Sequence, residues 1–287
     1  MDSITHTLFG LTLYAAIDKQ SMEKPLLRAI GFTAVAGSLA PDIDVISSLW
    51  DTQGLYQMWH RGITHSIFAV PVFAVILWLI CYLIWRTKDR RIFAVGLLAV
   101  FIHSTSDLFN AWGTGYLEPF SAVRVTFGVI PIVDFVVWAF ILGGFLIAKI
   151  KKIKSPFLFR MVGLLIVCHV ALQSVQGWLI YRDAIHQYER VTLSASFVPG
   201  QYAVIGQNGA IVDMYTANVW SRSDVQMRFE SNLNADLDYL FRNNPEARTL
   251  YQWSPIVVIE ETPEEIRLFD PRFYRNGESF LMESASK

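Results

Sequence analysis

The segment from Ile67 to Trp85 reads IFAVPVFAVILWLICYLIW and contains no charged residue. Its length matches the roughly 20 residues that an α-helix needs to cross about 30 Å of hydrocarbon. The composition of the 287-residue chain agrees, since 53% of its residues are hydrophobic and only 17% are charged, against about 25% charged residues in soluble domains. The sequence therefore predicts an integral membrane protein.

Five further apolar segments accompany this one. Three of them, Ile92–Phe109, Val125–Ile147 and Phe157–Tyr181, are further candidates for spans. Ile4–Ile17 and Leu26–Ala40 are shorter, and each could be a tilted helix, a half-helix or a re-entrant segment. We expect an α-helical integral membrane bundle of about six membrane segments within residues 1–182.

Basic residues mark alternate loops between these segments. Cytoplasmic loops carry an excess of Lys and Arg, which sets the orientation of a membrane protein. The pattern predicts a multi-pass protein of the cell (inner or plasma) membrane, with the N-terminus and the region after Tyr181 on the outer side. The basic residues of the three loops are Lys19, Lys24 and Arg28; Arg86, Lys88, Arg90 and Arg91; and Lys149, Lys151, Lys152 and Lys154.

The composition changes after Tyr181, and residues 183–287 contain no apolar run long enough to span a membrane. Stretches rich in β-branched residues at 191–198, 202–206 and 256–260 predict strands. Asn208-Gly209 between two such stretches is a typical hairpin signal, and residues 234–241 could form a short helix. We expect a small β-rich (α+β) extramembrane domain over residues 183–287, on the extracytoplasmic side.

Four clusters of His and Asp fall at the predicted membrane ends, all on the same, outer side. A buried ionisable residue costs several kcal/mol unless it is paired or bound to a metal. Because the basic loops place all these clusters on one side without using any of their residues, the sequence predicts a metal site there. The clusters contain His6; Asp42 and Asp44, which follow Pro41; His60 and His65; and His103 and Asp107.

The spacing within the clusters suits metal coordination. His103 and Asp107 are four residues apart and share one face of a predicted helix. Asp42 and Asp44 would point the same way in an extended loop. His60 and His65 are not a same-face pair, so one could be a ligand while the other supports it or contacts a substrate. Mixed His and carboxylate ligands suit Zn²⁺, and also Mn²⁺ or Fe²⁺.

The ordered motifs resemble a known family, the DUF457 or YdjM-like inner-membrane proteins, which are usually called metal-dependent hydrolases. The resemblance covers about residues 1–180 and implies a distant similarity to zinc-dependent phospholipase C and P1-type nucleases. It implies ligands among His6, Asp44, one of His60 and His65, His103 and Asp107. Because the second His-x-x-x-Asp/Glu helix of those soluble enzymes is lacking here, we expect one or two ions. The motifs are Asp2-Ser3-x-Thr5-His6, Pro41-Asp42-x-Asp44, His60-Arg61-Gly62-x-Thr64-His65-Ser66 and His103-x-x-x-Asp107.

These observations favour a membrane-bound, metal-dependent hydrolase of phosphoester or lipid-linked substrates. His60, His103 and Asp107 would hold the metal, with Asp44 bridging or ligating. Asp42 or His65 would act as general base or orient a ligand. Arg61 would hold a phosphate, or else anchor the chain at lipid headgroups. The alternative is a non-catalytic regulatory or interaction protein with a structural metal, and an ion transporter fits less well. Membrane lipids are the expected partners, whereas the net charge of -1 gives no reason to expect nucleic acid.

Overall fold

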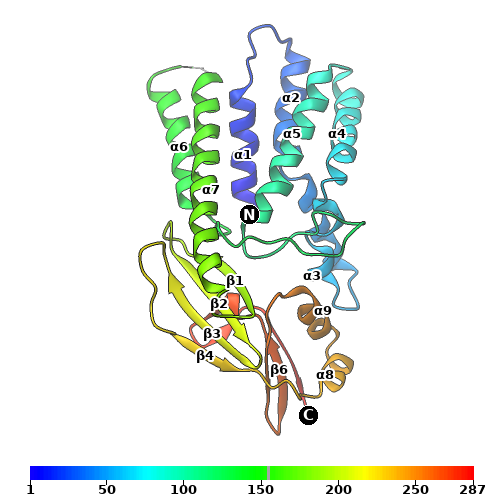
Figure 1. Cartoon of the computed structure of the whole chain (residues 1–287). Coiled ribbons are helices and arrows are strands. Elements are labelled where there is room, and N and C mark those ends of the chain that lie inside the picture. The colour runs from blue at the N-terminus through cyan, green and yellow to red at the C-terminus, as the bar shows by residue number, and fades with distance from the viewer. Residues whose placement is uncertain (154–155) are drawn as a thin grey trace. The chain divides into compact units, whose positions relative to one another are not determined.

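The computed structural model describes residues 1–153 and 156–287 (Figure 1). Lys154, one of the basic loop residues, lies outside the described residues. The chain forms two compact units. The helical unit comprises Met1–Asp44, Arg61–Thr126 and Pro131–Leu172, and the β-rich unit comprises Val45–His60, Phe127–Ile130 and Gln173–Lys287. The helical N-terminal half and the β-rich C-terminal region are thus confirmed, while the domain boundary after residue 182 stays a prediction.

The helical unit contains the long apolar helices. Helix α5 packs against α2 and α4, and α1 packs against α2, α5 and α6. Three 3₁₀ helices lie in the connections between the long helices. The first of them, η1, begins in this unit and ends in the β-rich unit. The helices are α1 (Ser3–Ala16), α2 (Lys24–Gly37), η1 (Ala40–Leu49), η2 (Ile63–His65), α4 (Ala69–Trp85), α5 (Arg90–Ser106), η3 (Asp107–Phe109), α6 (Phe135–Ile150) and the first part of α7 (Pro156–Ala184).

The number of helices able to cross a membrane is smaller than expected. Among the described residues, Arg90–Phe109 and Pro156–Ala184 are long and apolar enough, and two bent helix pairs raise the number to four at most. Helices α1 and α6 have 14 and 16 residues, which corresponds to about 21 and 24 Å at 1.5 Å per residue. Both are shorter than a hydrocarbon core of about 30 Å. The expectation of about six membrane segments is therefore not confirmed.

Asp134 explains why α6 is short. The sequence predicts a span from Val125, but the helix begins only at Phe135. Asp134 is its N-cap, and one carboxylate oxygen accepts hydrogen bonds from the backbone N–H groups of Val136 and Val137. A cap of this kind satisfies amide groups that have no partner inside the helix. Asp134 also accepts a 2.9 Å hydrogen bond from Nε2 of His169.

Small residues allow close contact between helices of this unit. A Cβ atom at Gly10 of α1 would lie 2.7 Å from the carbonyl oxygen of Ala34 on α2. A Cβ atom at Gly37 would lie 2.9 Å from the Cβ of Ala99 on α5. Interfaces of this kind are typical of membrane helices, where packing rather than the hydrophobic effect drives association. They bring the ends of α1, α2 and α5 together, where the His and Asp clusters lie.

The β-rich unit contains two antiparallel sheets and a two-stranded ribbon. The first sheet has the order β1-β2-β3-β4, and the second has the order β5-β6-β9. The strands are β1 (Arg190–Ala195), β2 (Tyr202–Asn208), β3 (Ile211–Ala217), β4 (Met227–Glu230), β5 (Val258–Glu261), β6 (Glu265–Phe269), β7 (Tyr274–Arg275), β8 (Glu278–Ser279) and β9 (Met282–Ser286). The helices of the unit are α3 (Tyr56–Trp59), α8 (Leu237–Asn243), α9 (Pro245–Trp253), the 3₁₀ helix η4 (Pro271–Phe273) and the last turns of α7.

The predicted hairpin is confirmed in this unit. Strands β2 and β3 pair with Asn208 opposite Ile211, so a two-residue turn joins them, and Gly209 takes the left-handed conformation that such turns favour. A buried core between the sheets includes Ile205 and Val258. The hydroxyl of buried Tyr202 donates a 2.8 Å hydrogen bond to the carbonyl oxygen of Gln173 and so joins β2 to α7.

Candidate metal centre

Four side chains of the helical unit bring metal-ligating atoms together. Asp42, His65, His103 and Asp107 each offer one donor atom, and these four atoms all lie within 4.8 Å of one another. The donors come from three places in the fold: η1, η2, and the C-terminal end of α5 where η3 begins. The site is therefore built by tertiary packing and not by one local motif.

The spacing of the four donors fits a divalent cation. His65 Nε2 lies 3.3 Å from Asp42 Oδ1, 3.1 Å from His103 Nε2 and 3.5 Å from Asp107 Oδ2. His103 Nε2 lies 3.4 Å from Asp42 Oδ1 and 3.8 Å from Asp107 Oδ2. Metal–ligand bonds of about 2.0–2.2 Å in tetrahedral geometry would separate donors by roughly 3.3–3.6 Å. Two imidazoles and two carboxylates also supply the negative charge that a dication requires.

A backbone carbonyl orients His103. Helix α2 ends at Gly37, with Ser38 as its C-cap, and the carbonyl oxygen of Ser38 lies 2.7 Å from His103 Nδ1. A carbonyl oxygen only accepts, so Nδ1 carries the proton and Nε2 turns its lone pair towards the other three donors. Such a contact is typical of metal-ligating histidines, in which the second nitrogen donates to a fixed acceptor.

Asp44 supports His65 in the same way. Its Oδ2 lies 3.3 Å from His65 Nδ1, and it accepts hydrogen bonds from the Thr64 hydroxyl at 2.6 Å and from the Arg61 backbone N–H at 2.9 Å. Asp42 and Asp44 contact opposite nitrogens of the His65 ring, and they lie in a 3₁₀ helix and not in an extended loop. With three residues per turn, side chains two positions apart differ by about 240°. The expectation of an extended loop was therefore wrong.

His6 lies beside the four donors. Its side chain is fully buried, and its ring stacks on that of His103 with a centroid separation of 3.7 Å. Neither ring nitrogen makes a hydrogen bond with any residue that the structure describes, although Nε2 lies 3.4 Å from Asp107 Oδ1. A buried imidazole without a hydrogen bond costs free energy, and a metal ion shared with Asp107 would remove that cost.

Arg61 is a buried neighbour of the donor Asp107. The residue takes a left-handed backbone conformation, with a φ of 57°. Its buried guanidinium donates to Asn110 Oδ1 and to the Met1 carbonyl oxygen, both at 3.0 Å, and its Nε lies 3.4 Å from Asp107 Oδ2. The Met1 amino group contacts the other oxygen of Asp107. Asn110, which sequence reasoning missed, lies three residues after Asp107 and accepts from Arg61.

The predicted site residues separate into three sets in the structure. Asp42, His65, His103 and Asp107 supply the four donors, and His6, Asp44 and Arg61 contact members of that group. His60 is not one of the four, and its ring stacks on Tyr56 within the β-rich unit, with a centroid separation of 5.4 Å. Which of these residues bind metal or take part in catalysis stays a prediction. A possible metal-binding group is established, and the identity of its metal is not.

Comparison with known proteins agrees with these observations. The family model described as YdjM inner membrane protein matches residues 1–178, a range that contains all the residues of the candidate metal centre. The uncharacterized protein YfhP of Bacillus subtilis (strain 168) is 38% identical over 138 residues. That match covers 47% of this chain and 42% of the relative, which is less than half of its length. No solved structure matches the chain.

Proposed function

This chain belongs to the YdjM inner membrane protein family, and we propose that it is a membrane-bound, metal-dependent hydrolase of phosphoester or lipid-linked substrates. The observation that carries this proposal is the group of four donor atoms from Asp42, His65, His103 and Asp107 within 4.8 Å of one another. We further propose a multi-pass arrangement with the β-rich domain on the extracytoplasmic side. The basic loops are the support for that orientation.

The four donors would hold a first ion, with Zn²⁺ as the best fit to two imidazoles and two carboxylates. His6 and Asp107 would hold a second. When bound, such an ion supplies a Lewis acid that polarises a phosphoryl oxygen and activates water. The proposed substrates follow from this chemistry and from the location of the site in a membrane protein.

The chain's own residues would keep the donors in place. The Ser38 carbonyl oxygen and the Asp44 carboxylate would each hold one imidazole proton, on His103 and His65 respectively. Arg61 would partly neutralise Asp107 and fix its orientation through Nε. Because its guanidinium already donates to Asn110 and Met1, Arg61 is better suited to positioning Asp107 than to binding a substrate phosphate.

Asp42 marks the side from which a substrate would approach. Its side chain is 20% exposed, whereas the side chains of His65, His103 and Asp107 are fully buried. A phosphoester would therefore meet the ion on the side of Asp42. The Asp42 carboxylate is also the group best placed to accept a proton from an attacking water molecule.

Metal analysis combined with a hydrolysis assay tests this function. Detergent-purified wild-type protein is expected to retain a stoichiometric divalent metal and to hydrolyse a phosphodiester or a fluorescent phospholipid analogue. Asp107→Asn is expected to lose most of the bound metal and most of the hydrolytic activity while still inserting into the membrane. His186→Asn is the matched control, because His186 is exposed in the β-rich unit. Metal without turnover in the wild type would instead favour the non-catalytic alternative, and absence of metal would refute the site.

A further inference from the structure

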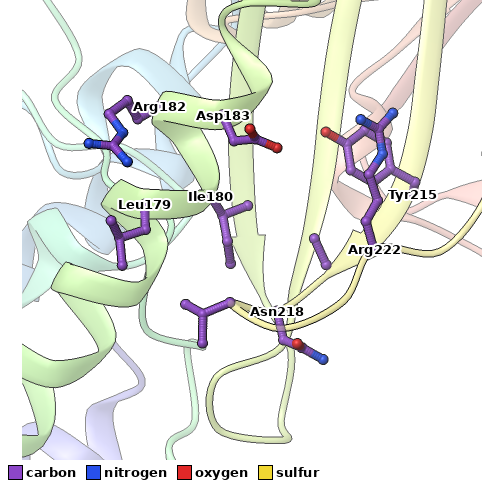
Figure 2. A pocket seen from close by; sticks show the side chains of 9 residues that line it. Leu179, Ile180, Arg182, Asp183, Tyr215, Asn218 and Arg222 are labelled. Atoms are coloured by element: carbon purple, nitrogen blue, oxygen red, sulfur yellow. The ribbon is translucent and has the colours of Figure 1, made fainter.

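The β-rich unit contains a pocket separate from the candidate metal centre. It has a volume of about 380 Å³ and lies between the last turns of α7 and the end of β3 with the segment that follows (Figure 2). Pockets that bind small ligands have volumes from about 300 Å³ upward. The lining residues are Leu179, Ile180, Arg182, Asp183, Tyr215, Ala217, Asn218, Val219 and Arg222.

One wall of the pocket carries a fixed positive charge. The Arg222 guanidinium lies over the Tyr215 ring, 3.9 Å from its centroid, and donates a 2.5 Å hydrogen bond to Gln187 Oε1. An arginine held in this way binds an anionic oxygen with less loss of side-chain entropy. Burial raises the pKa of Tyr215, so its hydroxyl remains a proton donor beside the guanidinium.

The opposite wall carries a negative charge. Figure 2 shows the Asp183 carboxylate directed towards Tyr215 and Arg222, while Arg182 points away from them. Among the residues that the structure describes, none forms an ion pair or a hydrogen bond with this carboxylate. The pocket therefore presents a guanidinium and a carboxylate on facing walls, and Leu179, Ile180 and Val219 also line it. Such a pocket is complementary to a ligand that carries both charges.

The helix that carries Asp183 has the features of a membrane interface. Pro156–Ala184 is a candidate membrane span, and its last turns expose Trp178 by 56% and Tyr181 by 41%. The Arg182 guanidinium stacks on Trp178, with its central carbon 5.0 Å from the ring centroid. Aromatic side chains gather at the level of lipid headgroups, and arginine places its charge in the same region. Lipid headgroups are therefore the zwitterions within reach of this pocket.

We propose that this pocket binds the zwitterionic headgroup of an amine-bearing phospholipid. The phosphate would contact Arg222 and the Tyr215 hydroxyl, and the ammonium group would contact Asp183. The acyl chains would remain in the bilayer beside Trp178. This proposal does not depend on the metal centre, because none of the lining residues belongs to it.

The test is lipid binding by the full chain in detergent, measured by calorimetry with short-chain phosphatidylethanolamine and phosphatidylglycerol. Asp183→Asn is expected to weaken binding of phosphatidylethanolamine by about tenfold or more, as for the loss of a hydrogen bond between charged groups, and to leave phosphatidylglycerol binding unchanged. Arg222→Gln is expected to weaken the binding of both lipids. Arg190→Gln, at an exposed arginine of β1 outside the pocket, is the matched control and should change neither.

Three outcomes would overturn the proposal. The first is no binding of phosphatidylethanolamine by the wild type. The second is equal affinity for both lipids with no effect of Asp183→Asn, which would mean that the carboxylate selects no amine. The third is binding of soluble phosphoethanolamine as tight as that of the lipid, which would identify a free metabolite as the ligand. Thermal denaturation of each variant checks that lost binding does not reflect unfolding.

Discussion

Replacing Asp44 by alanine tests whether Asp44 orients the metal ligand His65 or binds the metal itself. Asp44 Oδ2 holds the Nδ1 side of His65, while His65 Nε2 faces the other donors. Without the carboxylate, His65 loses the acceptor that fixes its tautomer and the direction of its ring. The four donor atoms themselves remain. We therefore expect Asp44→Ala to weaken metal binding and not to abolish it.

The size of the effect follows from this geometry. Loss of a residue that supports a metal-ligating histidine typically costs 10–100-fold in affinity, or about 1.4–2.7 kcal/mol. His65→Ala, which removes a donor atom, should lose much more. Asp44→Asn keeps an oxygen that can accept from Nδ1 and should fall between the wild type and Asp44→Ala. The assay is competition with a zinc chelator of known affinity, using detergent-purified protein.

Two results would refute this reasoning. If Asp44→Ala lost as much affinity as His65→Ala, Asp44 would itself be a ligand. If Asp44→Ala bound metal as the wild type does, the contact with His65 would have no role in the site. His169→Ala is a useful control, because His169 contacts Asp134 and is not one of the four donor residues. Its metal affinity should be unchanged.

Two further predictions concern stability. Gly10→Ala places a Cβ atom 2.7 Å from the Ala34 carbonyl oxygen and should destabilise the helical unit by about 1–3 kcal/mol in unfolding with sodium dodecyl sulfate. Gly143→Ala, whose Cβ would meet nothing within 4 Å, should instead stabilise by about 0.5–1 kcal/mol, and equal effects would contradict the role of close packing. In the β-rich unit, Arg228 donates to both oxygens of Asp213 and lowers the pKa of this carboxyl below its usual 3.8. A carboxyl whose pKa is lower in the folded state stabilises the fold at pH values above its unfolded pKa. This stabilisation is lost as the pH falls through the folded pKa. The difference in unfolding free energy between wild type and Arg228→Gln should therefore shrink between pH 6 and about pH 3, and a constant difference would exclude this ion pair as its source.

Much of the site could be predicted from the sequence, because the pattern of basic loops predicts one membrane side for its residues. The basic loops place His6, Asp42, His65, His103 and Asp107 on one side without reference to those residues, and the structure brings them together. The spacing of four between His103 and Asp107 also works as a local rule, because both lie at the end of α5. The basic loops and the helical spacing were thus sufficient to predict that these residues lie near one another, but not that Asp42 and His65 supply two of the four donor atoms.

The sequence could not resolve positions that depend on short irregular segments. His60 and His65 are separated by a bend and a three-residue 3₁₀ helix, and no simple periodicity tells which of them turns inward. Asp42 and Asp44 contact different nitrogens of His65, and the 3₁₀ helix η1 that carries them was not predicted from the sequence. The expected number of about six membrane segments is not confirmed. One reason is that hydropathy does not register a cap such as Asp134, which shortens the helix after it.

The contact between His103 and the Ser38 carbonyl oxygen has a consequence for how the chain can evolve. The acceptor belongs to the main chain, so no side-chain substitution at position 38 removes it as long as α2 ends at the same place. The Ser38 hydroxyl donates to the Ala34 carbonyl oxygen and is not needed for this contact. Other small residues should therefore keep the contact at this buried position, whereas insertion of a single residue into α2 would rotate the carbonyl group away by about 100°. The orientation of His103 therefore depends on the length of α2 more than on which small residue occupies position 38.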